Sequence, residues 1–431
     1  MRGAILLLPG LLLLLGSPAT AASVHLEVRE DLSLIYHRDI SSPTTVVQIL
    51  LRGGQSQEPP DRCGVAYLAH RLSFRVQDPQ KNKQLAEWGT DLEIQVLPDH
   101  SLLTVVCLSK HLNGTLGMIG AALGEPSISK NPVFFAKKSL PFLQKSEEDD
   151  DLRFLALQVR RRFFSAGCSG DSLYGDETSR DRIQPVDVRD YHRAVFTRSR
   201  ITVAVVSDLA PQAVVDIFSR HFPRFPEGDR NPPPPPRTRA PGEVSPIRDR
   251  HQVLFSLCVP LPALSPANLA RLHLVRVLLD SGPGSRLWAL RRLRHLAYTV
   301  GVLSLQTDDG GVLVAYLKIR PGNLDAARHG LRAIFSDLNE RGVGEDEWQA
   351  LMAGTRADLL RRNEAKKDRA ATLAFLASHG WAQETPEDFL RCIEAQDPAS
   401  FNAYLKRVFH PGNIREIILG PEGLLAGIEA Q

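Results

Sequence analysis

The chain has 431 residues, of which 43% are apolar and 23% are charged. This length predicts two or three domains, and this composition supports buried cores and argues against global disorder. The net charge of +3 is small for the length, so the sequence gives no reason to expect a nucleic-acid partner.

The chain opens with the features of a secretory signal peptide. Arg2 supplies the positive start, and residues 5–15 form a mostly apolar run. That run is well short of the roughly 20 residues that a membrane span needs. Small residues up to Ala21 and Ala22 provide a cleavage region. We therefore predict a signal peptide over residues 1–22 and a secreted or periplasmic protein without a stable membrane span. An uncleaved anchor is the alternative.

Two successive sets of predicted strands and helices follow, and they share one layout. Each set opens with strands, continues with a helix, a shorter helix and a strand hairpin, and closes with long helices and a late strand. The first set is expected at residues 24–28, 33–36, 45–51, 64–74, 85–88, 91–96, 101–107 and 201–206. The second is expected at residues 252–259, 268–279, 287–293, 298–303, 311–317 and 417–419. Hairpins grouped beside helices predict an α+β fold of two similar domains, each a mostly antiparallel sheet packed with helices.

A proline-rich break separates the two sets. Residues 225–237 include a run of consecutive prolines and no apolar periodicity, which is typical of a stiff, extended spacer. An SH3-type ligand is the alternative interpretation. The predicted organisation is therefore a first domain over residues 23–225, a linker over residues 226–246 and a second domain over residues 247–431.

The five cysteines are widely spaced along the chain, and no two of them form a C-x-x-C pair. The usual spacing of thiolate zinc ligands is therefore absent. We expect mostly buried, small apolar side chains and at most one or two disulfides. The cysteines are Cys63, Cys107, Cys168, Cys258 and Cys392.

The predicted helix at residues 64–74 carries a family resemblance. Residues 51–74 read LRGGQSQEPPDRCGVAYLAHRLSF, which is similar to the approach to the active-site helix of the pitrilysin/insulinase (M16) zinc peptidases. The resemblance extends over nearly the whole mature chain and includes the SLYG loop around Tyr174 and the strand at residues 201–206. It implies a metallohydrolase fold of the processing-peptidase type.

In that family the helix carries the motif H-x-x-E-H. The two histidines bind zinc, the glutamate activates the zinc-bound water, and a glutamate from a later helix completes the ligands. Aligned without gaps from Gly64, this chain has Tyr67 at the first histidine position, His70 at the glutamate position and Arg71 at the second histidine position. A permanent cation at the metal position would repel zinc.

Alignment and spacing give different positions for the glutamate that the family supplies from a later helix. The alignment of the acidic run that follows it places Leu143 at the ligand position, whereas spacing alone allows Glu147 or Glu148. We therefore expect no catalytic residue, no metal and no cofactor in this chain. His70 is expected to be a partly buried polar residue on the wall of the former active site.

Residues 285–298, SRLWALRRLRHLAY, resemble the family run S-R-L-x-x-x-L-R-x-x-x-G-L-A-Y. In the family an arginine and a tyrosine seven residues apart bind the substrate peptide beside the zinc. Arg291 and Tyr298 match that spacing, and both side chains can donate hydrogen bonds to peptide carbonyls or a carboxylate. The stretch before Arg291 is one residue shorter than in the family, and His295 stands at the usual glycine position. A solvated basic face and a core tyrosine are the alternative interpretation.

Proteins of this family close two such halves around the substrate, in some cases as two separate chains. One chain of such a pair carries the zinc, and the other supplies the arginine and tyrosine. The resemblance thus implies a non-catalytic subunit of a secreted or periplasmic heterodimeric zinc peptidase. Its expected partners are an active subunit with an intact H-x-x-E-H motif, which holds the zinc, and a peptide substrate. A stand-alone peptide-binding or scaffold protein is the alternative, and an autonomous peptidase with an unconventional metal site is the third hypothesis.

Overall fold

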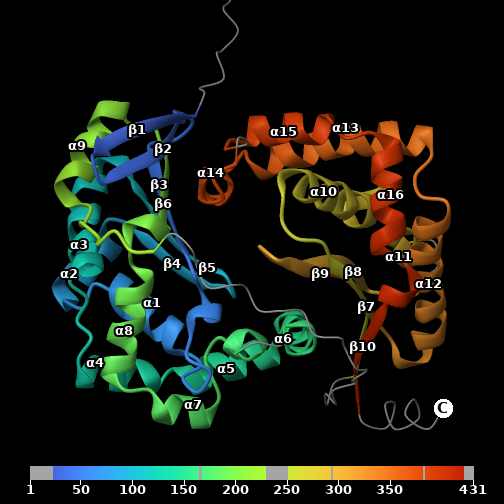
Figure 1. Cartoon of the computed structure of the whole chain (residues 1–431), viewed down its shortest axis with the longest axis horizontal. Coiled ribbons are helices and arrows are strands. Elements are labelled where there is room, and N and C mark those ends of the chain that lie inside the picture. Colours follow the sequence, from blue (N-terminus) through green and yellow to red (C-terminus); the bar gives the residue numbers. More distant parts are fainter. Residues whose placement is uncertain (1–22, 165–166, 230–250, 293–294, 382–383, 422–431) are drawn as a thin grey trace, which may run out of the picture.

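The computed structural model describes residues 23–164, 167–229, 251–292, 295–381 and 384–421. The predicted signal peptide and most of the predicted linker lie outside these described residues. The strands form two sheets, one in each half of the chain, with helices around them (Figure 1). The predicted α+β class with two antiparallel-rich sheets is confirmed, whereas the exact domain boundaries stay predictions.

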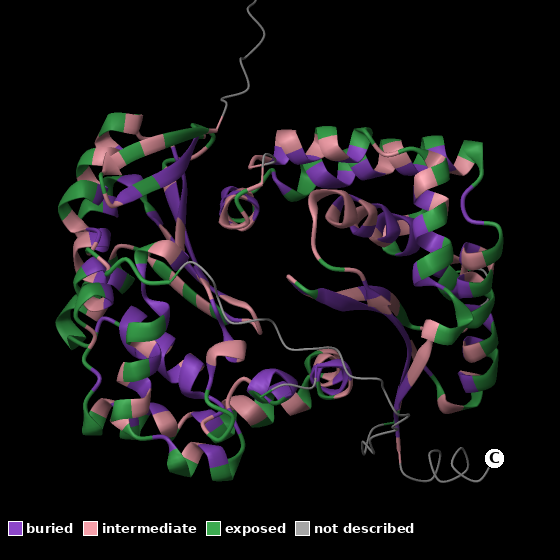
Figure 2. Ribbon diagram, in the orientation of Figure 1, coloured by how far each residue is buried: buried purple, intermediate pink, exposed green. Residues whose placement is uncertain are grey.

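The first sheet has six strands in the order β1-β2-β6-β3-β5-β4. Its central strand β3 reads TTVVQILLR and is buried at every position between its two ends. Such a near-continuous apolar run is expected where both faces of a sheet are covered, and the centre of this sheet is purple in Figure 2. All pairings are antiparallel except that of β2 with β6. The strands are β1 (Val24–Arg29), β2 (Leu32–Arg38), β3 (Thr44–Arg52), β4 (Asp91–Val96), β5 (His100–Leu108) and β6 (Ile201–Ser207).

The second sheet has four antiparallel strands in the order β10-β7-β9-β8. Its middle strands β7 and β9 are buried along nearly their whole length. The strands are β7 (Val253–Leu261), β8 (Thr299–Thr307), β9 (Gly310–Ile319) and β10 (Arg415–Leu419).

Helices cover each sheet and complete a separate apolar core in each half. Among the described residues, no helix is both long enough and apolar enough to cross a membrane. The helices of the first half are α1 (Val65–Phe74), α2 (Pro79–Glu87), α3 (Leu112–Gly124), α4 (Lys130–Lys137), α5 (Leu140–Asp149), α6 (Asp151–Phe163), α7 (Glu177–Arg182), α8 (Pro185–Val195) and α9 (Pro211–His221). Those of the second half are α10 (Pro266–Asp280), α11 (Arg286–Arg292), α12 (Leu324–Glu340), α13 (Glu345–Arg362), α14 (Lys366–Ser378), α15 (Pro386–Glu394) and α16 (Pro398–Val408).

One helix from each half packs against the sheet of the other half. Helix α14 packs Leu373 and Ala374 against β3 of the first sheet, where it meets Val46 and Leu50. Helix α6 packs Leu155, Val159 and Phe163 against the second sheet in the same way. Both helices lie in the middle of the molecule, between the two lobes (Figure 1). The apolar faces of the two sheets are therefore completed by segments that are remote in sequence.

Candidate functional site

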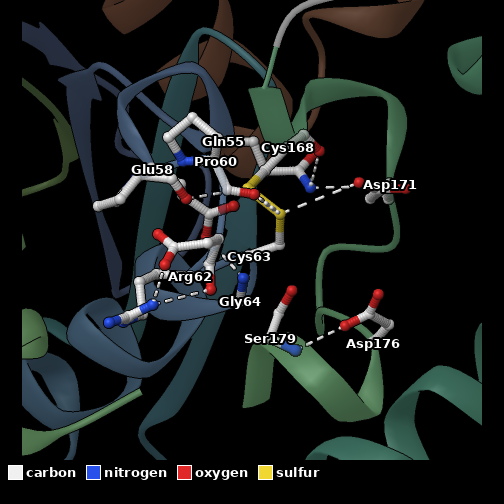
Figure 3. Close-up of a disulfide and its surroundings, with 12 residues drawn as sticks. Gln55, Glu58, Pro60, Arg62, Cys63, Gly64, Cys168, Asp171, Asp176 and Ser179 are labelled. Atoms are coloured by element: carbon white, nitrogen blue, oxygen red, sulfur yellow. Dashed lines mark hydrogen bonds and ion pairs between the residues drawn. A yellow bond between two sulfur atoms is a disulfide. The ribbon is translucent and has the colours of Figure 1, made fainter. Parts of the chain in front are cut away.

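The loop before α1 holds the start of that helix through a carboxylate and a disulfide (Figure 3). Oε1 of Glu58 accepts hydrogen bonds from the backbone N–H groups of Gly64 at 2.9 Å and Ala66 at 2.8 Å. These are among the amides that a helix start leaves without an internal partner. Cys63 forms a disulfide with Cys168, 105 residues further along the chain. Burial raises the pKa of Glu58 to about 8.

His70 is fully buried, so the prediction of a partly buried side chain on the wall of the old site is wrong. Its exposed fraction is 0%, and its Nδ1 lies 2.6 Å from the Ala66 carbonyl oxygen, to which it donates. The imidazole packs among the rings of Phe74, Tyr191 and Phe196, at centroid distances of 5.3 to 5.9 Å. Burial lowers the pKa of His70 to about 4. The side chain at the family's general-base position is therefore a neutral core residue.

Tyr67 and Arg71, one turn apart on α1, occupy the family's two zinc-histidine positions. The Tyr67 ring packs edge-on against Tyr174 with a centroid distance of 5.0 Å. The loop that contains Tyr174 lies close to Gly64, which has a φ of +101°. A Cβ at position 64 would stand 3.0 Å from the Tyr174 carbonyl, so glycine permits this close approach. Nη1 of Arg71 donates to Oγ of Ser139 at 2.8 Å. A guanidinium stays protonated and has no lone pair for a metal.

The candidate positions for the third ligand are Leu143, Glu147 and Glu148. Leu143 is partly buried and packs against the core of the first half. Glu147 forms a buried ion pair with Arg160, whose Nη2 lies 2.9 Å from Oε1, and its Oε2 accepts a hydrogen bond from Ser172 at 2.6 Å. Glu148 accepts a hydrogen bond from a glutamine of its own helix at 3.0 Å. The residues at these positions therefore do not fit a zinc ion, and no catalytic step can be derived through one.

Arg291 and Tyr298 lie at the two ends of the connection between α11 and β8. Arg291 is exposed, and its guanidinium carbon lies 5.2 Å from the ring centroid of Trp288. Tyr298 is 47% exposed, and its hydroxyl accepts a hydrogen bond from Nε of Arg320. The structure thus brings Tyr298 together with Arg320 rather than with Arg291. Sequence reasoning missed Arg320, because only the pairing of β8 with β9 brings its segment beside Tyr298.

His295, which stands at the family's usual glycine position, has a left-handed backbone conformation. Its φ is +52°, and it is the single non-glycine residue with a positive φ among those that the structure describes. Left-handed backbone disfavours side chains with a Cβ by roughly 1–2 kcal/mol. The side chain of His295 therefore introduces local strain before Tyr298.

A groove of about 360 Å³ lies beside the replaced motif, between α1 and α4. Arg71 and Arg75 line one side of it, Phe135 lines the other, and none of its lining residues is acidic. Phe135 is 66% exposed. The groove therefore offers cationic groups and an aromatic ring beside Arg71.

The comparisons with known proteins agree with this arrangement. Residues 182–354 match a family model described as the Peptidase M16 inactive domain. No curated protein matches the chain. A protease from Helicobacter pylori superimposes with a TM-score of 0.81 at 16% identity, over 93% of this chain and 100% of that one. A peptidase M16 inactive domain from Pseudomonas fluorescens gives 0.76 at 17% identity, over 93% and 98%. An M16-like peptidase from Alicyclobacillus acidocaldarius gives 0.77 at 12% identity, over 93% and 99%.

The two α+β lobes together have the fold of M16-like peptidases. Structural likeness at these identities establishes the fold, and residues 182–354 in addition match the Peptidase M16 inactive domain.

Proposed function

We propose that this chain is the non-catalytic subunit of a secreted or periplasmic heterodimeric M16-type zinc peptidase. In this proposal an active partner with an intact H-x-x-E-H motif holds the zinc. Arg291 and Tyr298 contribute to the binding of a peptide substrate in the chamber that the two subunits enclose.

The observation that carries the proposal is the contrast between the two halves. In the first half α1 forms the expected helix, while Tyr67, His70 and Arg71 stand at the aligned positions of the two histidine ligands and the general base. In the second half the Arg291 guanidinium and the Tyr298 phenol stay exposed. A chain without the family's catalytic residues, but with exposed side chains that can donate hydrogen bonds to a peptide, suits an accessory role.

The first test is purification of the tagged chain from its native host, with mass spectrometry of the proteins that co-purify. We expect a chain of similar size with H-x-x-E-H in equal amount. Recovery of this chain alone at full yield would refute the heterodimer.

The second test measures peptide hydrolysis by the complex after substitution of the donors. Arg291→Ala and Tyr298→Phe should each raise KM or lower kcat/KM by roughly tenfold, as the loss of one hydrogen bond to a charged or peptide group implies. Arg292→Ala is the matched control, because Arg292 is equally exposed beside Trp288. Unchanged turnover in both variants, with the dimer intact, would remove these residues from the site.

A stand-alone peptide-binding protein is the second candidate, and the groove between α1 and α4 favours it. Its Arg71, Arg75 and Phe135 side chains suit a peptide with acidic and apolar groups. This candidate predicts that the isolated chain binds acidic peptides, with the affinity lowered by Arg75→Ala. The heterodimer predicts that peptide binding requires the partner.

A further inference from the structure

A buried cluster of sulfur and oxygen donors lies at the start of α1, apart from the replaced zinc motif. The Sγ atoms of Cys63 and Cys168 and a carboxylate oxygen of Glu58 all lie within 4.8 Å of one another. The exposed fractions of these residues are 3%, 0% and 5%. Figure 3 shows Glu58 and the disulfide in the region around Gly64.

Hydrogen bonds fix one oxygen of the Glu58 side chain, as is common for carboxylates that bind metals. Its Oε1 accepts from the two backbone N–H groups at the start of α1, so this oxygen is fixed. Its Oε2 is buried and has no hydrogen-bond partner among the described residues. Buried polar atoms are rarely left without a partner, and fixing one carboxylate oxygen by hydrogen bonds typically orients the other toward a metal. The sulfur atoms of a disulfide carry no hydrogen, so they cannot donate a hydrogen bond to Oε2 of Glu58.

A fourth donor stands at the edge of the cluster. Oδ2 of Asp171 lies 3.9 Å from Sγ of Cys63. A sulfur in a disulfide has no hydrogen to donate, so this contact is not a hydrogen bond in the oxidised protein. Asp171 is exposed, which gives the cluster access to solvent. Nε2 of Gln55 donates to the carbonyls of Cys168, Asp171 and Ser172 at 3.0, 3.3 and 3.3 Å and so holds this loop in place.

We propose that reduction of the Cys63–Cys168 disulfide creates a binding site for a thiophilic divalent cation such as Zn²⁺. The ligands are the two thiolates, Oε2 of Glu58 and Oδ2 of Asp171. Two thiolates with two carboxylates form a donor set that suits tetrahedral zinc. The site is distinct from the H-x-x-E-H position and does not depend on the proposed function.

A dithiol reductant supplies the electrons that open the Cys63–Cys168 disulfide. The S–S bond takes up two electrons and two protons, two thiols form, and the dithiol becomes a disulfide. Zinc binding then displaces to solvent the two thiol protons and the proton that Glu58 carries below its pKa of about 8. Tetrahedral zinc with bonds of about 2.3 Å places two thiolate sulfurs about 3.8 Å apart. The Cα atoms of the two cysteines lie 5.3 Å apart, so side-chain rotation is sufficient to reach that separation.

The test compares the full chain in its oxidised form with the full chain reduced by a phosphine. The phosphine reduces the disulfide to two thiols and becomes a phosphine oxide, whose oxygen comes from water. Zinc alone is titrated against a chromogenic chelator, and bound zinc is counted by mass spectrometry of the metal. We expect one zinc per reduced chain and none per oxidised chain. Zinc should also protect Cys63 and Cys168, but not Cys392, from alkylation, as mapped by peptide mass spectrometry.

Variants separate a built site from adventitious thiol binding. Glu58→Gln retains an oxygen for the α1 amides and should weaken zinc binding by more than tenfold. Asp171→Asn should weaken it by a smaller factor. Asp61→Asn is the matched control, because this exposed residue lies in the same loop and pairs with Arg62. Equal zinc affinity of Glu58→Gln and the parent, or alkylation of Cys63 and Cys168 unaffected by zinc, would overturn the proposal. The alkylation result on the parent chain decides the matter even if a variant fails to fold.

Discussion

Nη2 of Arg160 on α6 lies 2.9 Å from Oε1 of Glu147 on α5, and their side chains are only 8% and 7% exposed. The carboxylate that spacing alone would allow as a zinc ligand is therefore the counterion of a buried guanidinium. This pair, with Ser172, ties α5, α6 and the following loop together in the first half. Glu147 is thus part of the structural framework of the first half.

Loss of this ion pair should destabilise the protein strongly. Glu147→Gln leaves the Arg160 guanidinium buried without a counter-charge, and we expect the free energy of unfolding to fall by about 3–5 kcal/mol. Urea denaturation followed by circular dichroism measures the change. Lys145→Gln breaks the exposed pair with Asp149 on the same helix and should change stability by less than about 0.5 kcal/mol. A loss below about 1 kcal/mol for Glu147→Gln would contradict the structural role.

His70 should make stability depend on pH on the acidic side. Burial lowers its pKa from 6.5 to about 4, so the unfolded chain binds this proton more readily than the folded chain. The stabilisation is therefore complete above pH 6.5 and is lost as the pH falls toward 4. Between pH 7 and pH 5 this one residue should account for about 2 kcal/mol.

The measurement compares urea denaturation at pH 7 and pH 5 for the parent chain and for His70→Gln, whose amide can still donate to the Ala66 carbonyl. The difference between the two pH values should shrink in the variant by about 2 kcal/mol. His329→Gln, at an exposed position of α12, is the control and should leave the difference unchanged. An identical pH dependence in His70→Gln would show that this imidazole is not the group that titrates.

Lys366 should hold α14 on the first sheet. Its Nζ donates to the backbone carbonyls of Asp39, Ser42 and Thr44 at 2.7, 2.8 and 2.9 Å, and the residue is 8% exposed. Lys366→Met removes all of these donors, so we expect a loss of about 3 kcal/mol and faster amide exchange in α14.

The matched control for this change is Lys367→Met. The neighbouring Lys367 forms an exposed pair with Glu93 of β4, and its loss should cost less than about 0.5 kcal/mol. Equal effects of the two substitutions would show that the Lys366 contacts do not anchor α14.

His295→Gly should stabilise the chain. The φ of +52° at this position favours glycine by roughly 1–2 kcal/mol in the folded state, whereas glycine in the unfolded chain offsets part of that gain. We expect a net gain of about 0.5–1 kcal/mol, seen as a higher Tm in calorimetry. His295→Ala keeps the Cβ and should give no gain. A lower Tm for the glycine variant would mean that the imidazole makes contacts that outweigh the strain.

Much of the architecture was predictable because it rests on local patterns. The apolar run of β3, the helix at α1 and the hairpin of β4 with β5 are each encoded by a short stretch of residues. The expectation that this chain lacks the zinc motif rests only on the identities of Tyr67, His70 and Arg71 at fixed spacing, and it stays a prediction. The burial of His70 was underestimated because the aromatic rings around it come in part from α8 and the residue that follows that helix.

The sequence by itself therefore determined the fold class, the replaced metal ligands and the spacing of Arg291 and Tyr298. Tertiary structure alone decided which remote groups meet: Cys63 with Cys168, Tyr298 with Arg320, and α14 with the first sheet. The physical reason is that periodicity identifies a face that must be buried but not the segment that covers it. Pairings across many residues depend on the path of the whole chain, which hundreds of weak contacts set together.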